Sequence, residues 1–79
     1  MSVRYVIETA LGTADGANCV FRTARGYFPR TVRVFLNGFV LRKDYDNGWT
    51  ELGERKLRLN EAPQKGDVVQ IYYAIDPSG

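Results

Sequence analysis

Apolar and polar residues alternate with a period of two in several short stretches of this 79-residue chain. In the clearest stretch, Leu57 and Leu59 alternate with charged or polar residues. A period of two is typical of a β-strand with one buried face, and no segment shows the 3.6-residue period of a helix over three turns. The alternation therefore predicts strands over residues 3–9, 19–23, 55–60 and 68–75.

The stretch TVRVFLNGFVLRKDY, residues 31–45, predicts a β-hairpin closed by Asn37-Gly38. Asn-Gly favours a two-residue type I′ turn, because both central residues must adopt positive φ. A turn of this length sets Leu36 opposite Phe39. One face of the hairpin then carries Val32, Val34, Leu36, Phe39 and Leu41, and the other carries Arg33, Phe35, Val40 and Arg42. The first face is expected to join the core, whereas the second is half apolar and half cationic.

Loops rich in Gly, Asp, Asn and Pro separate the expected strands. Between the hairpin and the strand at 55–60 lie a second Asn-Gly, at 47–48, and Leu52-Gly53; one is expected to be a turn and the other a bulge or loop. The pattern predicts an all-β fold, a small single-domain β-sandwich of six to seven short antiparallel strands over residues 1–79.

Histidine is absent and Cys19 is the one cysteine, so Ser-His, Cys-His and His-metal chemistry are excluded. We therefore expect no enzyme, no catalytic residues and no cofactor. Asp44 and Asp46 precede a glycine, but that glycine is the fifth residue of the run rather than the sixth that an EF-hand requires. A looser calcium loop is the remaining metal hypothesis, and a polar turn is the favoured interpretation.

The net charge of +2 is too small to indicate nucleic-acid binding by itself. Its distribution is uneven, since residues 1–43 carry seven Lys and Arg against two acids and residues 44–79 carry four against seven. No apolar run approaches the roughly 20 residues of a membrane span, and the first ten residues do not resemble a signal peptide. We expect a protein made and assembled in a cytoplasm, with no membrane partner.

Three stretches in fixed order resemble small β-domains in virion proteins of tailed bacteriophages: residues 15–23, 28–45 and 56–73. The shared pattern is Val-x-Val-Phe-x-Asn-Gly, then Asp-Tyr, Ala-Pro and Gly-Asp-x-Val. Residues 46–56 are longer than the usual short turn of that pattern. The resemblance implies the architecture and virion context of tail fibre, neck or head accessory proteins, and no catalytic activity.

A virion context predicts a structural protein that binds other phage proteins, present as a homo-oligomer or symmetric array and located in the virion. The chain starts at Met1 without a linker, so we expect a complete accessory component for capsid decoration, the neck or head-tail region, or tail attachment. The expected interface residues are Arg33, Phe35, Val40 and Arg42, followed by Tyr27, Phe28 and Trp49. Tyr27 and Phe28 are either a lid over the core or a docking tip, and Trp49 is either a core or a contact residue.

Two other functions remain open. Basic residues interleaved with aromatic ones suit single-stranded nucleic acid, whose bases stack on rings while cations follow the phosphates, although this partner is the less favoured one. Receptor or glycan binding at a fibre tip would depend first on Trp49 and Tyr72.

Overall fold

The chain folds entirely into β-strands and connecting loops, in a computed structural model that describes residues 3–28, 30–53 and 55–76. No helix occurs within these ranges. The strands are β1 (Arg4–Thr9), β2 (Val20–Arg22), β3 (Arg33–Leu36), β4 (Phe39–Leu41), β5 (Trp49–Gly53), β6 (Lys56–Leu59) and β7 (Val69–Ile75). All strands expected from the alternation are present, and β5 lies where the sequence indicated turns.

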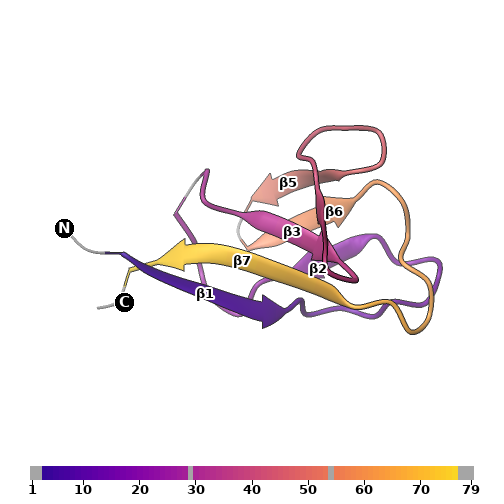
Figure 1. Cartoon of the computed structure of the whole chain (residues 1–79), viewed down its shortest axis with the longest axis horizontal. Helices are drawn as coiled ribbons and strands as arrows, with labels where there is room; N and C mark the ends of the chain where they lie inside the picture. Colours follow the sequence, from indigo (N-terminus) through magenta and orange to yellow (C-terminus); the bar gives the residue numbers. More distant parts are fainter. Residues whose placement is uncertain (1–2, 29, 54, 77–79) are drawn as a thin grey trace.

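Two antiparallel sheets lie one behind the other, as Figure 1 shows. The first sheet has the order β1-β7-β3-β4 and the second the order β2-β6-β5. Strands far apart in sequence become neighbours in the first sheet, because β7 lies between β1 and β3. The all-β sandwich prediction is confirmed.

The hairpin at Asn37-Gly38 has the predicted turn and register. Asn37 has φ 51° and Gly38 has φ 86°, as a type I′ turn requires. The side chain of Asn37 also ties the turn to the segment before β7, since its amide nitrogen donates to Asp67 at 3.1 Å and its oxygen accepts the Val68 N–H at 2.8 Å. The pairs are Val34 with Leu41, Phe35 with Val40 and Leu36 with Phe39.

Gly48 and Gly53, the glycines of the two turn signals after the hairpin, have different roles. Gly53, with φ 85°, pairs with Lys56 after a register shift between Glu51 and Gly53, which marks a β-bulge. Gly48 ends the turn after β4 and packs so closely that a Cβ there would lie 1.7 Å from the Arg42 carbonyl oxygen. The structure thus assigns the turn to Asn47-Gly48 and the bulge to Leu52-Gly53, a choice that the sequence left open.

Both sheets contribute to one core. From the four-stranded sheet come Val34, Ile71 and Tyr73, and from the three-stranded sheet Leu57 and Leu59, each 1% exposed or less. The inward positions predicted for Leu57 and Leu59 are confirmed.

Phe39 corrects one core prediction. It is 77% exposed, although it shares the parity of Val34 and Leu36. Phe39 follows the turn directly and begins β4, which is an edge strand, so its side chain lies at the open corner of the sheet. Leu36, opposite it on the inner strand, packs against the core instead.

Candidate functional site

The side of the four-stranded sheet that faces away from the core is the strongest candidate for a functional surface. Its position follows from the register, in which residues alternate with the buried Val34, Ile71 and Tyr73. We call this side the outer face. Its exposed and half-buried side chains are Tyr5, Ile7, Thr9, Arg33, Phe35, Val40, Gln70 and Tyr72.

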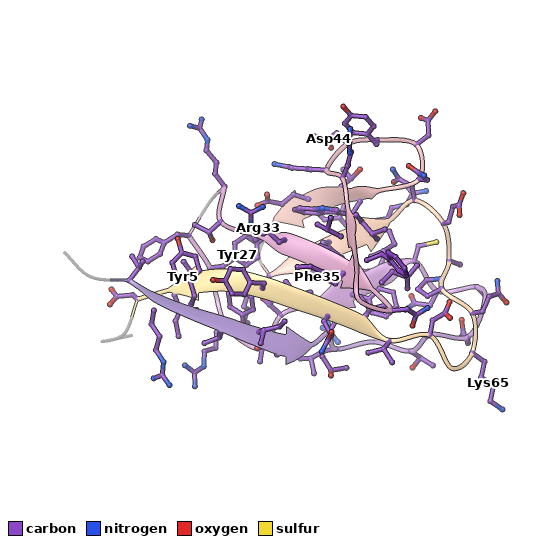
Figure 2. The ribbon with its side chains drawn as sticks, viewed as in Figure 1. Tyr5, Tyr27, Arg33, Phe35, Asp44 and Lys65 are labelled. Carbon is purple, nitrogen blue, oxygen red and sulfur yellow. The ribbon has the colours of Figure 1, made fainter. Side chains whose placement is uncertain are left out.

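The apolar part of the outer face is open to solvent. Tyr5 is 52% exposed, and Ile7 and Val40 are each 57% exposed, so no described segment covers them. Tyr5 and Tyr72 stack across β1 and β7, with ring centroids 5.2 Å apart and planes at 15°. Figure 2 looks onto this sheet and shows Tyr5, Arg33 and Phe35 over its strands. Rings stacked in this way present a flat, preorganised apolar surface.

Three of the predicted interface residues meet on this face. Phe35 is half-buried and lies between Gln70 on β7 and Val40 on β4, and Arg33 lies opposite Tyr72. The pairing of β3 with β7 places Arg33 beside Tyr72, which lies 39 positions later in the chain. Phe35 and Val40 are therefore adjacent apolar groups with a cation beside them.

Arg42 lies just beyond the end of β4. Its guanidinium carbon lies 5.3 Å from the centroid of the Tyr45 ring, within cation–π range. Its carbonyl accepts the Trp49 N–H at 3.1 Å, which joins the end of β4 to the start of β5. The side chain remains exposed and extends the positive charge past the edge of the sheet.

Two adjoining hollows border the outer face and share Arg30, Val32 and Arg33. The first has a volume of about 460 Å³ and also contacts Arg42 and Lys43. The second, of about 430 Å³, is also lined by the stacked pair of tyrosines. We call the four cations Arg30, Arg33, Arg42 and Lys43 the basic rim. Glu51 is the one acid that lines either hollow, so the rim favours anionic groups.

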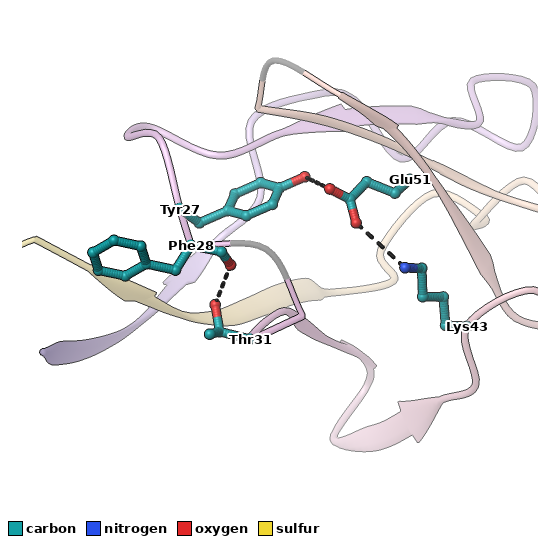
Figure 3. A network of polar contacts seen from close by, with 5 residues as sticks. All are labelled: Tyr27, Phe28, Thr31, Lys43 and Glu51. Atoms are coloured by element: carbon teal, nitrogen blue, oxygen red, sulfur yellow. Dashed lines mark hydrogen bonds and ion pairs between the residues drawn. The ribbon is translucent and has the colours of Figure 1, made fainter.

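Tyr27 occupies the lid position rather than a docking tip. It packs against the core and meets Tyr73 edge-on at 6.0 Å. Its hydroxyl donates to Glu51 at 3.0 Å, and Glu51 also accepts an ion pair from Lys43 at 3.5 Å, as Figure 3 shows. Burial and then this hydrogen bond raise the pKa of Tyr27 to about 12.

Phe28 is half-buried in the same loop. Its N–H donates to the Ala74 carbonyl at 3.0 Å, and its carbonyl accepts the Thr31 hydroxyl at 2.7 Å. The first bond holds the loop against β7, and the second closes the loop on itself. A contact role for the Phe28 ring remains a prediction.

Trp49 lies in the core and is 3% exposed. The sequence left core and contact positions open for it, and the structure decides for the core. Its indole packs where β5 begins and has the Lys43 ammonium 5.8 Å from the ring centroid. A residue so enclosed presents almost no area to a partner or to a sugar ring, so we do not carry Trp49 into the proposed interface.

Tyr5 and Ile7 were not singled out from the sequence. The signal available for β1 was that Val6 lies between Tyr5 and Ile7, so that apolar residues point to both sides. Only the pairing of β1 with β7 shows that the tyrosine side faces outward and stacks on Tyr72.

Within residues 3–28, 30–53 and 55–76, no three acidic or thiol side chains group closely enough to hold a metal ion. The same ranges contain no helix with the length and apolar character to cross a membrane. Comparison with protein-family models, curated proteins and solved structures gave no match to this chain. The outer face and the sequence pattern are therefore the features of this chain that bear on its function.

Proposed function

We propose that this protein is a structural component of a tailed-bacteriophage virion that binds other virion proteins through its outer face. The observation that carries the proposal is the set of uncovered apolar side chains on that face: Tyr5, Ile7 and Val40 are each more than half exposed. Exposed apolar area concentrated on one face of a small soluble protein is typical of an interaction surface. Its burial by a partner would provide the binding free energy, at about 25 cal/mol per Å² of apolar area before the costs of association.

The basic rim adds a preference for the partner's charge. Interfaces commonly surround an apolar centre with polar and charged residues that set orientation and specificity. Arg33 lies within the face and Arg30 lines both hollows beside it. The matching surface would be apolar at its centre and acidic at its margin.

The virion context derives from the sequence pattern. The Asn-Gly hairpin, Ala-Pro and Gly-Asp-x-Val elements resemble phage virion domains, and the hairpin forms in the expected register. We propose several copies per particle, as a homo-oligomer or symmetric array, in capsid decoration, at the neck or head-tail region, or in tail attachment.

Matched valine substitutions test the interface. Val40→Asp places a charge on the outer face, and Val20→Asp places the same charge on β2, where Val20 is 41% exposed on the opposite side of the sandwich. We expect circular dichroism to show both variants folded. In a co-sedimentation assay, Val20→Asp should sediment with the particles, whereas Val40→Asp and Phe35→Asp should stay in the supernatant.

The outcomes test two claims separately: that the outer face is the interface, and that the protein belongs to the virion. A folded Val40→Asp chain that incorporates as fully as the wild type would remove the outer face from the proposal. A wild-type chain that is missing from purified particles of the phage that encodes it would remove the virion role.

Single-stranded nucleic acid is a second candidate, favoured by the hollow in which Tyr5 and Tyr72 lie beside Arg30 and Arg33. Aromatic rings and cations together bind bases and phosphates. Retention on immobilised single-stranded DNA that falls steeply with salt, and that falls further in an Arg33→Glu variant, would support this candidate. Retention that does not depend on salt would exclude it.

A further inference from the structure

β1 is the one edge strand in the described structure that is both long and uninterrupted. The two sheets have four edges, formed by β1, β4, β2 and β5. β2 and β4 have three residues each, and β5 carries the bulge. β1 has six residues with neither proline, glycine nor bulge, and Figure 1 shows no strand beyond it. Exposed strand edges invite pairing with another strand, and proteins usually shorten or distort them.

The other edges are also partly occupied by the chain itself. Leu11 exchanges backbone hydrogen bonds with Arg22 of β2, at 2.8 Å and 2.9 Å. The segment after β4 turns back so that the Trp49 N–H reaches the Arg42 carbonyl. β1 is therefore the edge best suited to receive a strand.

The backbone groups that β1 offers can be assigned from one hydrogen bond. Ala10 follows β1 in register, and its N–H donates to the Val69 carbonyl at 2.8 Å. Hydrogen bonds alternate along an antiparallel strand, so Val6 and Glu8 also direct their N–H and C=O groups toward β7. Tyr5, Ile7 and Thr9 then direct theirs to the open edge.

The sequence of β1 is complementary to itself. Suppose that two copies align antiparallel about a two-fold axis at Val6. Tyr5 then lies opposite Ile7 of the partner subunit. The backbone N–H and C=O groups of both residues point to the open edge, so they can pair. In the same register Arg4 lies opposite the partner's Glu8, so the pair joins opposite charges. An axis at Tyr5 would set Arg4 opposite the partner's Val6, and an axis at Ile7 would set it opposite the partner's Ala10. Only the axis at Val6 matches both backbone and charge.

The Glu8 carboxylate has acceptor capacity left for such a contact. Its two carboxylate oxygens accept the Tyr73 hydroxyl at 2.5 Å and the Ala24 N–H at 2.8 Å. Both donors are neutral, and the ion pair found among the described residues joins Lys43 to Glu51 instead. A carboxylate has acceptor sites for further donors, and a guanidinium is a strong one.

We propose that two copies of this chain pair through β1, antiparallel and centred on Val6, so that their four-stranded sheets become one continuous sheet. The partner is a second copy because the charge pattern of β1 is matched by β1 itself. Tyr5 of one copy then lies beside Ile7 of the partner subunit, and the two outer faces merge into one surface. The inference rests on the multi-copy part of the proposed function, but it is testable on the purified chain alone.

Sedimentation velocity over a concentration series should show a species of twice the 8.9 kDa chain mass. Ile7→Pro removes an N–H that points to the open edge and not to β7, so the variant is expected to stay folded and become monomeric. Ile7→Thr retains that N–H and is the matched control, expected to remain dimeric. Arg4→Glu, which opposes the partner's Glu8, should raise the dissociation constant about tenfold at low salt.

Disulfide trapping tests the axis itself, even if Ile7→Pro does not fold. In a Cys19→Ser background, Val6→Cys faces its own copy at about 4.5 Å between Cα atoms, within disulfide range. Thr9→Cys in the same background is about 20 Å from its own copy in this register. Mild oxidation should give a covalent dimer for Val6→Cys and a monomer for Thr9→Cys.

A wild-type chain that stays monomeric at every concentration, equal cross-linking of the two cysteine variants, or a fully dimeric and folded Ile7→Pro variant would each overturn the pairing. A monomer that still enters particles would leave the proposed function in place. A dimer that never enters particles would leave the β1 pairing in place and overturn the proposed function.

Discussion

The two sheets present different surfaces to solvent. On the four-stranded sheet, aromatic and aliphatic side chains continue across β1, β7, β3 and β4. On the three-stranded sheet, the outward residues are Val20, Arg22, Thr50, Leu52, Lys56 and Arg58, of which Val20 and Leu52 are apolar and the others are basic or polar. The second surface resembles an ordinary solvated sheet face, and the first does not.

The difference between the sheets shows which apolar side chains pack in the core and which remain exposed to solvent. β6 alternates exposed and buried residues, so all its apolar side chains lie in the core. β7 and β1 have apolar residues on both sides, and only the inward ones meet the core. Apart from the buried Ala74, the outward residues are available to another protein, and six substitutions can test that interpretation.

The largest contrast should come from adjacent residues of β7 that face opposite ways. Ile71→Ala empties a fully buried position and should lower the free energy of unfolding by about 2–5 kcal/mol. Tyr72→Ala removes an outer-face ring and should lower it by less than about 1.5 kcal/mol, mostly through the lost stack on Tyr5. Chemical denaturation measures both. Equal losses would mean that the outer face stabilises the monomer and is not held in reserve for a partner.

The next effect is a pH dependence of the free energy of unfolding, which comes from Tyr73 on the inward side of the same sheet. Burial and then the hydrogen bond to Glu8 raise the pKa of Tyr73 from 10.0 to about 12. Because folding favours the protonated hydroxyl, its contribution is complete below pH 10 and is lost as the pH rises toward 12. The loss should be on the order of 2 kcal/mol.

Tyr73→Phe should flatten this pH dependence. The difference in unfolding free energy between variant and wild type, measured at pH 8 and again at pH 12, removes the common contribution of lysine titration. A difference that is the same at both pH values would contradict the assignment.

An effect of similar or smaller size is expected at the turn that holds the hairpin half of the outer face to β7. Asn37→Ala removes two side-chain hydrogen bonds and a residue that tolerates positive φ, and should cost about 1–3 kcal/mol. The Asn37 side chain, followed by the Gln64 N–H, holds the pKa of Asp67 below its usual range. The stability from Asp67 is therefore lost as the pH falls through its folded pKa.

In Asn37→Ala the pKa of Asp67 should rise toward its usual value, which an NMR titration of the carboxyl carbon would detect. An unchanged pKa together with unchanged stability would show that the turn does not anchor the hairpin.

The smallest effects should come from exposed valines on the solvent-facing sides of the two sheets. Val40→Lys and Val20→Lys replace exposed valines on opposite sides, and each should change the free energy of unfolding by no more than about 0.5 kcal/mol. If Val40→Lys instead destabilised the monomer as a core substitution does, the comparison between the faces would fail.

Local chemistry made several features predictable. Asn37-Gly38 determined a turn type and therefore a register, and the alternation of Leu57 and Leu59 determined an inward face. The site was predicted in part: Arg33, Phe35 and Val40 do share one side, because the hairpin register places them there.

The failures share a cause. Phe39 has the parity of a core residue, but parity does not say where a sheet ends, and Phe39 lies at its corner. Trp49 and Tyr27 were ambiguous, because whether a ring is covered depends on segments distant in sequence. β5 was missed since Gly48 and Gly53 bracket it and mark turns in isolation.

The sequence by itself determined an all-β chain, most of its strand positions, one hairpin register and the absence of histidine chemistry. These properties depend on residue identity and on neighbours within a few positions. Only the tertiary structure decided that β7 lies between β1 and β3, which brings Tyr5 and Ile7 into one surface with Phe35 and Val40. Strand order and edges arise from contacts between distant segments, and no local period of apolar residues encodes them.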